Sequence, residues 1–104
     1  MLAKYKLRVP DYLAKFVRGA HPDLRRKIKT ALRRIISDPY SGKSLREKLK
    51  GLSSYKVGRF RIIYHVASNH IIEIVAIGPR KIIYEVTYRI VIRDVQKRTK
   101  KTEL

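Results

Sequence analysis

Two cations beside a tight hairpin are the residues whose types and spacing most directly suggest chemistry. Gly58-Arg59 predicts a two-residue turn with glycine at the first central position, and such a turn places Lys56 directly opposite Arg61. Like charges that face each other across a sheet repel and lower stability. A bound phosphate would remove this repulsion, so the pair predicts a phosphate site.

A second turn brings a third cation toward this pair. If residues 68–69 form a two-residue turn, Arg61 lies opposite Ala76, and Gly78 and Arg80 follow on the same face toward the same end. We therefore expect Arg80 to lie near the lysine–arginine pair. Gly78 has no side chain, so it either lets a base or backbone approach this face or simply ends the strand.

The acidic residues are too scattered to hold a catalytic metal. Magnesium-dependent nucleases cluster their carboxylates, whereas the eight here are spread out: Asp11, Asp23, Asp38, Glu47, Glu73, Glu85, Asp94 and Glu103. RNA permits a metal-free reaction without a cofactor, because its 2′-OH attacks the adjacent phosphate when cations stabilise the transition state. Lys56, Arg61 and Arg80 would supply those cations. Tyr84 would either stack on a base or move a proton.

His65 is a further titratable residue on the predicted strand of Arg61. It lies two positions along on the same face, about 7 Å away by strand rise. An imidazole suits the role of general base, but an ordinary surface histidine explains this residue better. We therefore leave His65 outside the catalytic set.

The charge of the chain points to a polyanionic partner. Its 104 residues carry 26 Lys and Arg against 8 Asp and Glu, a net charge of +18, and both halves are basic. A thermophilic surface is an alternative source of lysine, but it pairs lysine with glutamate, and acids are too scarce here. There is no cysteine and no apolar stretch of signal-peptide or membrane-span length, so we expect one cytoplasmic domain and no membrane partner.

Periodicity predicts an α+β fold in the order β-α-α-β-β-β. Residues 3–9 alternate like a strand, and residues 10–19 and 22–38 carry the apolar stripes of two helices. Residues 39–50 read as a basic loop or short helical turn. Strand signals dominate from Tyr55 to Ile77, which predicts a small antiparallel sheet with the two helices packed on one face.

The segment after this sheet is ambiguous. Alternate residues between Ile82 and Ile92 are apolar or aromatic, as in a strand, but Ile83, Val86 and Ile90 also fit a helical stripe. We expect a C-terminal helical or extended segment, a domain over 1–96 and a basic tail over 97–104.

One face of the sheet should pack on the two helices and the other should bind the polyanion. The predicted core face consists of Phe60, Ile62, Val66, Ile71, Val75 and Ile77. The opposite face, which carries Arg61, is expected to be free of helices. On the second helix, Arg25, Arg26 and Arg33 are either an ordinary solvated surface or contacts to backbone phosphates.

Two motifs resemble those of the RelE/ParE superfamily of toxins. Residues 49–64, Leu-Lys-Gly-Leu-Ser-Ser-Tyr-Lys-Val-Gly-Arg-Phe-Arg-Ile-Ile-Tyr, resemble its "L-K-G … Y-R-V-G-x-Y-R-I-I-Y" signature. Residues 77–85, Ile-Gly-Pro-Arg-Lys-Ile-Ile-Tyr-Glu, resemble its late "I-G-x-R-x-x-I-Y" motif. With the leading strand and helices, the resemblance covers residues 3 to 92.

The resemblance implies a toxin that a cognate antitoxin wraps and neutralises, so that toxin and antitoxin form a hetero-oligomer. RelE-like members cleave mRNA in the ribosomal A site with a set of basic residues and a tyrosine. By motif, Lys56, Arg61, Arg80 and Tyr84 match the catalytic positions. Further RNA contacts are expected from basic residues around them and on the second helix: Arg25, Arg26, Arg33, Lys50, Arg59 and Lys81.

Two other functions remain open at this stage. RelE has a basic residue two positions before the Lys56 match, where this chain has Ser54, and its late tyrosine lies farther from its arginine than Tyr84 lies from Arg80. These departures favour a ParE-like, non-catalytic inhibitor of DNA gyrase. A basic nucleic-acid-binding module is the third alternative.

Overall fold

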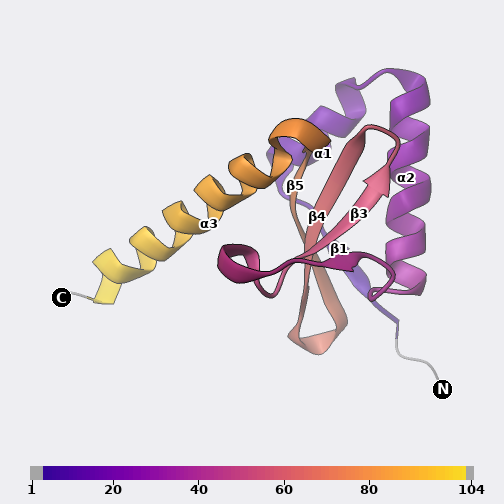
Figure 1. The fold of residues 1–104 in the computed structure, drawn as a ribbon. Coiled ribbons are helices and arrows are strands. Elements are labelled where there is room, and N and C mark those ends of the chain that lie inside the picture. The colour runs from indigo at the N-terminus through magenta and orange to yellow at the C-terminus, as the bar shows by residue number, and fades with distance from the viewer. Residues whose placement is uncertain (1–3, 103–104) are drawn as a thin grey trace.

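The structure, a computed structural model, describes the backbone of residues 4–102 and the side chains of residues 4–94. Its elements along the chain are β1 (Lys6–Arg8), α1 (Asp11–Gly19), α2 (Pro22–Ser37), β2 (Lys43–Ser44), the 3-10 helix η1 (Glu47–Leu49), β3 (Ser53–Val57), β4 (Phe60–Ala67), the 3-10 helix η2 (Ser68–His70), β5 (Ile71–Pro79) and α3 (Arg80–Thr102). The strands form one sheet in the order β1-β5-β4-β3-β2 (Figure 1). The predicted α+β class and the order of the predicted elements are confirmed, but the short strand β2 lies within residues 39–50, which were expected to form a loop or helical turn.

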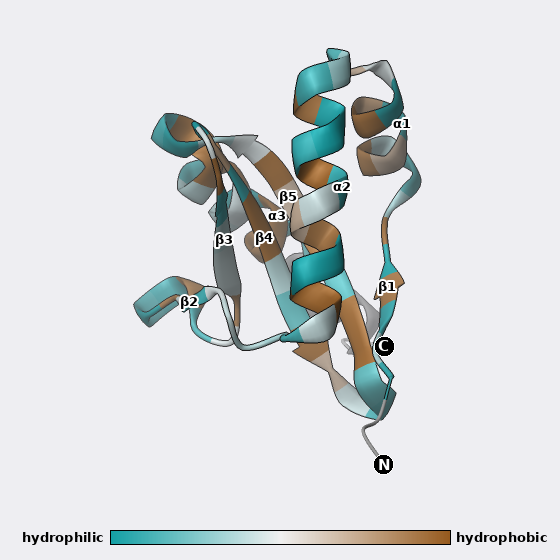
Figure 2. Ribbon diagram, turned by 90° about the vertical axis from the view of Figure 1, so that its right-hand side faces the viewer, coloured by the Kyte–Doolittle hydropathy of each residue, from teal (hydrophilic) through white to brown (hydrophobic). Residues whose placement is uncertain are grey.

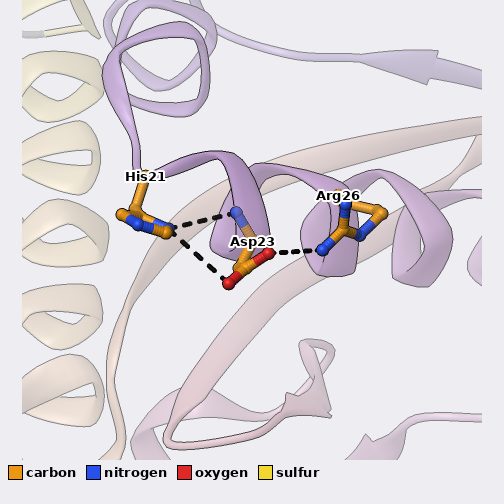
Figure 3. A network of polar contacts seen from close by, with 3 residues as sticks. All are labelled: His21, Asp23 and Arg26. Carbon is orange, nitrogen blue, oxygen red and sulfur yellow. Dashed lines mark hydrogen bonds and ion pairs between the residues drawn. The ribbon is translucent and has the colours of Figure 1, made fainter.

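The first two helices begin and end where the sequence predicts. Pro10 precedes α1, and Pro22 occupies the first turn of α2, where a missing N–H is harmless. The His21 side chain caps α2 by accepting a hydrogen bond from the Asp23 N–H at 3.2 Å (Figure 3). Helix α2 stops before Pro39, which cannot continue it.

Helices α1 and α2 cover one face of the sheet. Figure 2 shows α2 in front of the strands and α1 beside it, with polar and apolar segments alternating along α2. Their inward residues include Leu13, Ile28 and Ile35, which pack with Ile62 and Tyr64 of β4. These contacts form the main hydrophobic core and fix the orientation of the central strands.

Tyr64, the last residue of the first motif, is a structural anchor. Its side chain is fully buried, and its hydroxyl donates to the Pro39 carbonyl at 2.8 Å and accepts from the Gly42 N–H at 3.1 Å. Burial raises the pKa of the Tyr64 phenol above its usual value, so the hydroxyl stays protonated. A side chain at Gly42 would collide with this hydroxyl, which explains the glycine.

The sheet is mostly antiparallel, with one parallel pair that the sequence did not reveal. β1 pairs in parallel with β5, with Leu7 opposite Ile72. β3 pairs with β4 in the predicted register, so Lys56 lies opposite Arg61. The hairpin between them has the predicted glycine at positive φ, since φ of Gly58 is 58°.

The predicted register between β4 and β5 is wrong by two residues. Arg61 lies opposite Gly78 rather than Ala76. The turn is longer than predicted, because Ser68–His70 forms a 3-10 turn, and a bulge beside Ile63 inserts a further residue in β5. The turn and the bulge each shift the register by one residue. Because side chains alternate with a period of two, the combined shift of two residues leaves Arg61 and Gly78 on the same face.

The longer turn also changes the core face of the first half of β5, and the bulge returns Ile77 to its predicted face. Ile71 and Val75 were expected to pack on α1 and α2, but Ile72 and Ile74 are the residues buried there. Val75 packs on the opposite side of the sheet. The remaining predicted residues do pack against the main core: Phe60, Ile62, Val66 and Ile77.

The ambiguous C-terminal segment is the helix α3, which packs on the second face of the sheet. Ile83 of α3 forms a buried cluster there with Ile63 and Ala76. The expectation of a helix-free face is therefore wrong, because these apolar side chains need cover. Thr87, also buried, donates its hydroxyl to the Ile83 carbonyl at 2.7 Å. Figure 1 shows that α3 then projects away from the sheet.

The domain bounds of 1–96 and the basic tail over 97–104 stay predictions. The α3 backbone is helical as far as Thr102, and residues 103–104 lie outside the described part of the chain. Within the described residues, no helix combines the length and apolar character needed to cross a membrane.

Candidate nucleic-acid interface

Lys56 and Arg61 form the centre of the site on the face shared with α3. They are cross-strand partners in β3 and β4, and Gly78 of β5 flanks Arg61 on its other side. Lys56 is exposed, whereas Arg61 is half-buried. The Arg61 Nε is buried and has no hydrogen-bond partner among the residues that the structure describes. A buried donor of this kind is destabilising until an acceptor reaches the guanidinium.

Arg80 is held at the same end of the sheet by the backbone. Its N–H donates to the Arg59 carbonyl in the hairpin turn at 2.9 Å, so the first turn of α3 is tied to the β3–β4 hairpin. Arg59, Arg80 and Lys81 are all exposed. No acidic residue occupies the first turn of α3. The positive end of the α3 dipole therefore adds to the attraction of these cations for an anion.

Tyr84 reaches from α3 to β3 rather than into open solvent. Its hydroxyl and that of Ser54 are 3.2 Å apart and share a hydrogen bond. Ser54 is only 2% exposed, so Tyr84 is its partner within the protein. Ser54 lies opposite Ile63, two pairs along the strands from Lys56 and Arg61 and on the same face. The Tyr84 hydroxyl is therefore already engaged, on the face of the sheet that carries Lys56 and Arg61.

The lack of a side chain at Gly78 has a packing explanation. A Cβ there would come within 3.1 Å of Cδ1 of Ile83, in the first turns of α3. The space above Gly78 is thus occupied by α3, and the predicted close approach of a base or backbone at this position is not available. Ile83 and the Ile63 side chain below it form a ridge on the face of the sheet.

This ridge separates Arg61 from His65. Both lie on the same face of β4, with the fully buried Ile63 between them. On its side of the ridge, His65 Nδ1 lies 3.5 Å from a carboxylate oxygen of Glu73, whose other oxygen pairs with Arg8 at 3.2 Å. The exclusion of His65 from the catalytic set stays a prediction.

The predicted RNA contacts on α2 fall into different environments. Arg25 donates to the Arg18 carbonyl at 3.1 Å and so caps the end of α1. Arg26 is paired with Asp23 (Figure 3), and Arg33 is exposed. Lys50 is exposed in the turn after η1, a 3-10 helix that packs against α3. Arg25 is thus the one member of this set with a clear structural role.

A groove lies beneath the second half of α3, on the His65 side. Its volume is about 850 Å³, and Val75, Ile90 and Val91 form part of its apolar wall. The Tyr12 hydroxyl donates to the Val75 carbonyl at 3.0 Å at its margin. Burial, and secondarily the Asp94 carboxylate, raise the pKa of Tyr12. Among the described residues, no three acidic or imidazole side chains gather into a group that could hold a metal ion.

A family model decides the identity of the chain. Residues 4–84 match the model described as the ParE toxin of the type II toxin-antitoxin system parDE. The chain belongs to this toxin family, within the RelE/ParE superfamily. No curated protein sequence matches the toxin significantly.

Solved RelE structures share the fold of this toxin. The toxin in the RelBE2 complex of Mycobacterium tuberculosis is 22% identical, with a TM-score of 0.64, and the match covers 75% of this chain and 100% of that one. A free double-arginine mutant of E. coli RelE is 16% identical, with a TM-score of 0.70 and coverage of 89% and 99%. RelE in the RelE–RelB complex of Pyrococcus horikoshii OT3 is 17% identical, with a TM-score of 0.61 and coverage of 75% and 97%.

Sequence reasoning missed two features of the toxin's basic surface. Ser54 was read as an absent cation, but it is the buried partner of the Tyr84 hydroxyl. Lys27 of α2 was not singled out, yet it lines a groove beside β3 together with Arg34. The α2 periodicity carried the second signal, because these residues flank the buried Ala31 on the side away from Arg25.

Proposed function

We propose that this toxin is a metal-independent, ribosome-dependent mRNA endonuclease that inhibits translation. The observation that carries the proposal is Arg61, a half-buried arginine whose Nε donor has no partner in the described structure and which faces a second cation, Lys56. The two positive charges repel each other in the free protein, and a bound phosphate would relieve this repulsion. It is therefore preorganised for an anion.

In the proposed reaction, the 2′-hydroxyl of the mRNA attacks the adjacent phosphorus and the 5′-oxygen leaves. The 2′-oxygen gives up its proton, the 5′-oxygen gains one, and a 2′,3′-cyclic phosphate results. Arg61, Lys56 and Arg80 would stabilise the negative charge that grows on the phosphate oxygens. Tyr84 would stack on a neighbouring base, because its hydroxyl is engaged by Ser54.

A ParE-like inhibitor of DNA gyrase is the second candidate. Two observations favour it: the matching family model is that of ParE toxins, and the position of Ser54 holds no cation. In this function the basic face would dock on the gyrase–DNA complex without cutting nucleic acid. The two candidates differ in what is damaged in the cell.

Expression of the toxin, followed by parallel assays of messages and DNA, separates the two candidates. We expect arrested translation, messages cut within the ribosomal A site and unchanged DNA supercoiling. Intact messages together with DNA breaks or altered supercoiling would contradict the endonuclease and establish the gyrase function.

We further propose a cognate antitoxin as the protein partner, in the cytoplasm. RelE relatives were crystallised in complex with RelB antitoxins. The groove beneath α3 and the exposed apolar residues Ile82 and Val86 offer such a partner an apolar surface. A small acidic protein encoded beside the toxin gene should copurify with it, and a toxin gene that stands alone would count against the pair.

A further inference from the structure

A basic groove lies between β3 and α2, on the other side of β3 from the candidate site. It has a volume of about 380 Å³. Helix α2 contributes Arg26, Lys27, Thr30 and Arg34 to its walls, and the opposite wall runs from Tyr55 to Gly58 at the hairpin. The groove ends at the turn that also supports the candidate site.

Positive charge dominates this groove. Lys27, Arg34 and Lys56 make no ion pair with any acidic residue whose side chain the structure describes. Asp23 compensates only Arg26, at the end of α2, where it also faces His21 (Figure 3). Several cations around one concave surface repel one another, and a polyanion relieves that repulsion.

The spacing along α2 matches a nucleic-acid backbone. Arg26, Thr30 and Arg34 follow one another at intervals of four residues, so each is about 6 Å farther along the helix axis. Successive phosphates of an extended strand are separated by a similar distance. On the opposite wall, β2 pairs only with Ser53 and Ser54, so the edge of β3 from Tyr55 to Val57 has no strand neighbour in the described sheet.

Lys56 connects this groove to the candidate site. It lines the groove and also lies opposite Arg61 on the face that carries α3. The basic surface therefore continues around the edge of β3, from one face of the sheet to the other. A ligand that follows it would pass the β3–β4 hairpin, where Arg59 is exposed.

We propose that the α2–β3 groove binds the phosphodiester backbone of single-stranded RNA flanking the phosphate held at Arg61. The inference rests on the proposed endonuclease function and adds the path of the substrate strand, which bends around the edge of β3. A single strand suits this groove, because a volume of about 380 Å³ between a helix and one strand is far too small to enclose a duplex. The contacts are to phosphates, so the groove adds affinity without sequence preference.

Binding of 2′-O-methyl RNA, which cannot be cut by its own 2′-oxygen, tests the path. The groove variant is Lys27→Ala/Arg34→Ala, and the matched control is Lys15→Ala/Lys29→Ala, which removes two exposed charges outside the groove. The probes are single strands of about twelve and about three nucleotides, since basic channels cover roughly 4–16 nucleotides. Fluorescence anisotropy over a range of salt concentrations gives affinity and salt dependence.

We expect the groove variant to bind the longer strand about tenfold more weakly, with a logarithmic salt slope smaller by about 1.4 for two lost phosphate contacts. The short strand should bind both variants alike, because it fills only the Arg61 site. Equal losses in the groove and control variants would overturn the inference. An equal or larger loss for duplex DNA of matched length would also overturn it.

A cleavage assay on ribosome-bound message distinguishes failure of the inference from failure of the function. If the wild-type toxin cuts and the groove variant binds long RNA normally, only the groove inference is wrong. If the wild-type toxin does not cut while the groove variant loses RNA affinity, the binding path is retained and the endonuclease function is wrong.

Discussion

The two ends of β4 differ in how the charges on one face of the strand are balanced. At one end, Arg61 lies beside Lys56, and its buried Nε has no partner in the described structure. At the other end, His65 and Arg8 both lie within ion-pair distance of Glu73. The Glu73 carboxylate compensates positive charge at the His65 end, the neutralised end, whereas Arg61 has no acidic partner among the residues that the structure describes.

Helix α3 keeps these ends apart. Ile83 packs over Ile63 between them, so a group bound at Arg61 does not reach His65 across the sheet. Proximity in sequence, two residues along a strand, is therefore a poor guide to shared function here. Under the proposed function, the end of β4 without an acidic partner is the one that binds the phosphate.

Loss of a cation at the Arg61 end should have the largest effect. Arg61→Ala or Arg80→Ala should slow cleavage of ribosome-bound message by about 10²-fold or more, the scale for removing a positioned electrostatic donor. Cleavage is measured by primer extension with purified toxin and ribosomes. Folding should survive or improve slightly, because one of several crowded cations is removed. Folded variants with wild-type rates would show that the site is wrongly assigned.

The Tyr84–Ser54 contact should contribute to stability more than to catalysis. Tyr84→Phe leaves the buried Ser54 hydroxyl without its partner and should lower the free energy of unfolding by about 1–2 kcal/mol. Adding Ser54→Ala should restore part of that loss, since both polar groups are then gone. Urea denaturation measures each variant.

The same variants decide how Tyr84 acts on RNA. Because phenylalanine retains the ring, Tyr84→Phe should keep cleavage within about tenfold of wild type if the ring stacks on a base. A hundredfold loss in Tyr84→Phe, with Ser54→Ala at the wild-type rate, would instead assign proton transfer or hydrogen bonding to the phenol.

The sequence predicted most local features of the fold but few of its long-range ones. Helices 11–19 and 22–37 follow from apolar stripes bounded by proline, and the glycine turn fixes the Lys56–Arg61 register. The bulge beside Ile63 leaves no composition signal, since apolar residues continue on both sides of it. The parallel pairing of β1 joins segments distant in sequence, so no turn specifies it.

The sequence also could not predict the C-terminal helix or its effect on the residues of the candidate site. Residues 82–92 alternate like a strand, and only the need to cover Ile63 and Ala76 selects the helix. That helix gives Gly78 its packing role and gives Ser54 its tyrosine partner. The catalytic roles of Arg61, Arg80, Tyr84 and Lys56 stay predictions.

Changes at the neutralised end should have the smallest effect. His65→Ala should leave cleavage within about twofold of wild type and change stability by less than about 1 kcal/mol, because its contact with Glu73 is partly exposed. The same cleavage and urea assays apply. A loss approaching that of Arg61→Ala would mean that α3 moves aside and that His65 joins the chemistry.

The most direct test of the unsatisfied donor is the magnetic resonance signal of the Arg61 Nε–H group. Its burial should keep the proton in slow exchange, and the side-chain signal of Arg8, whose Nη1 donates a hydrogen bond to Glu73, provides an internal reference at the neutralised end. Titration with a short 2′-O-methyl RNA should shift the Arg61 signal and leave that of Arg8 in place. An unshifted Arg61 signal at saturating RNA would contradict the account.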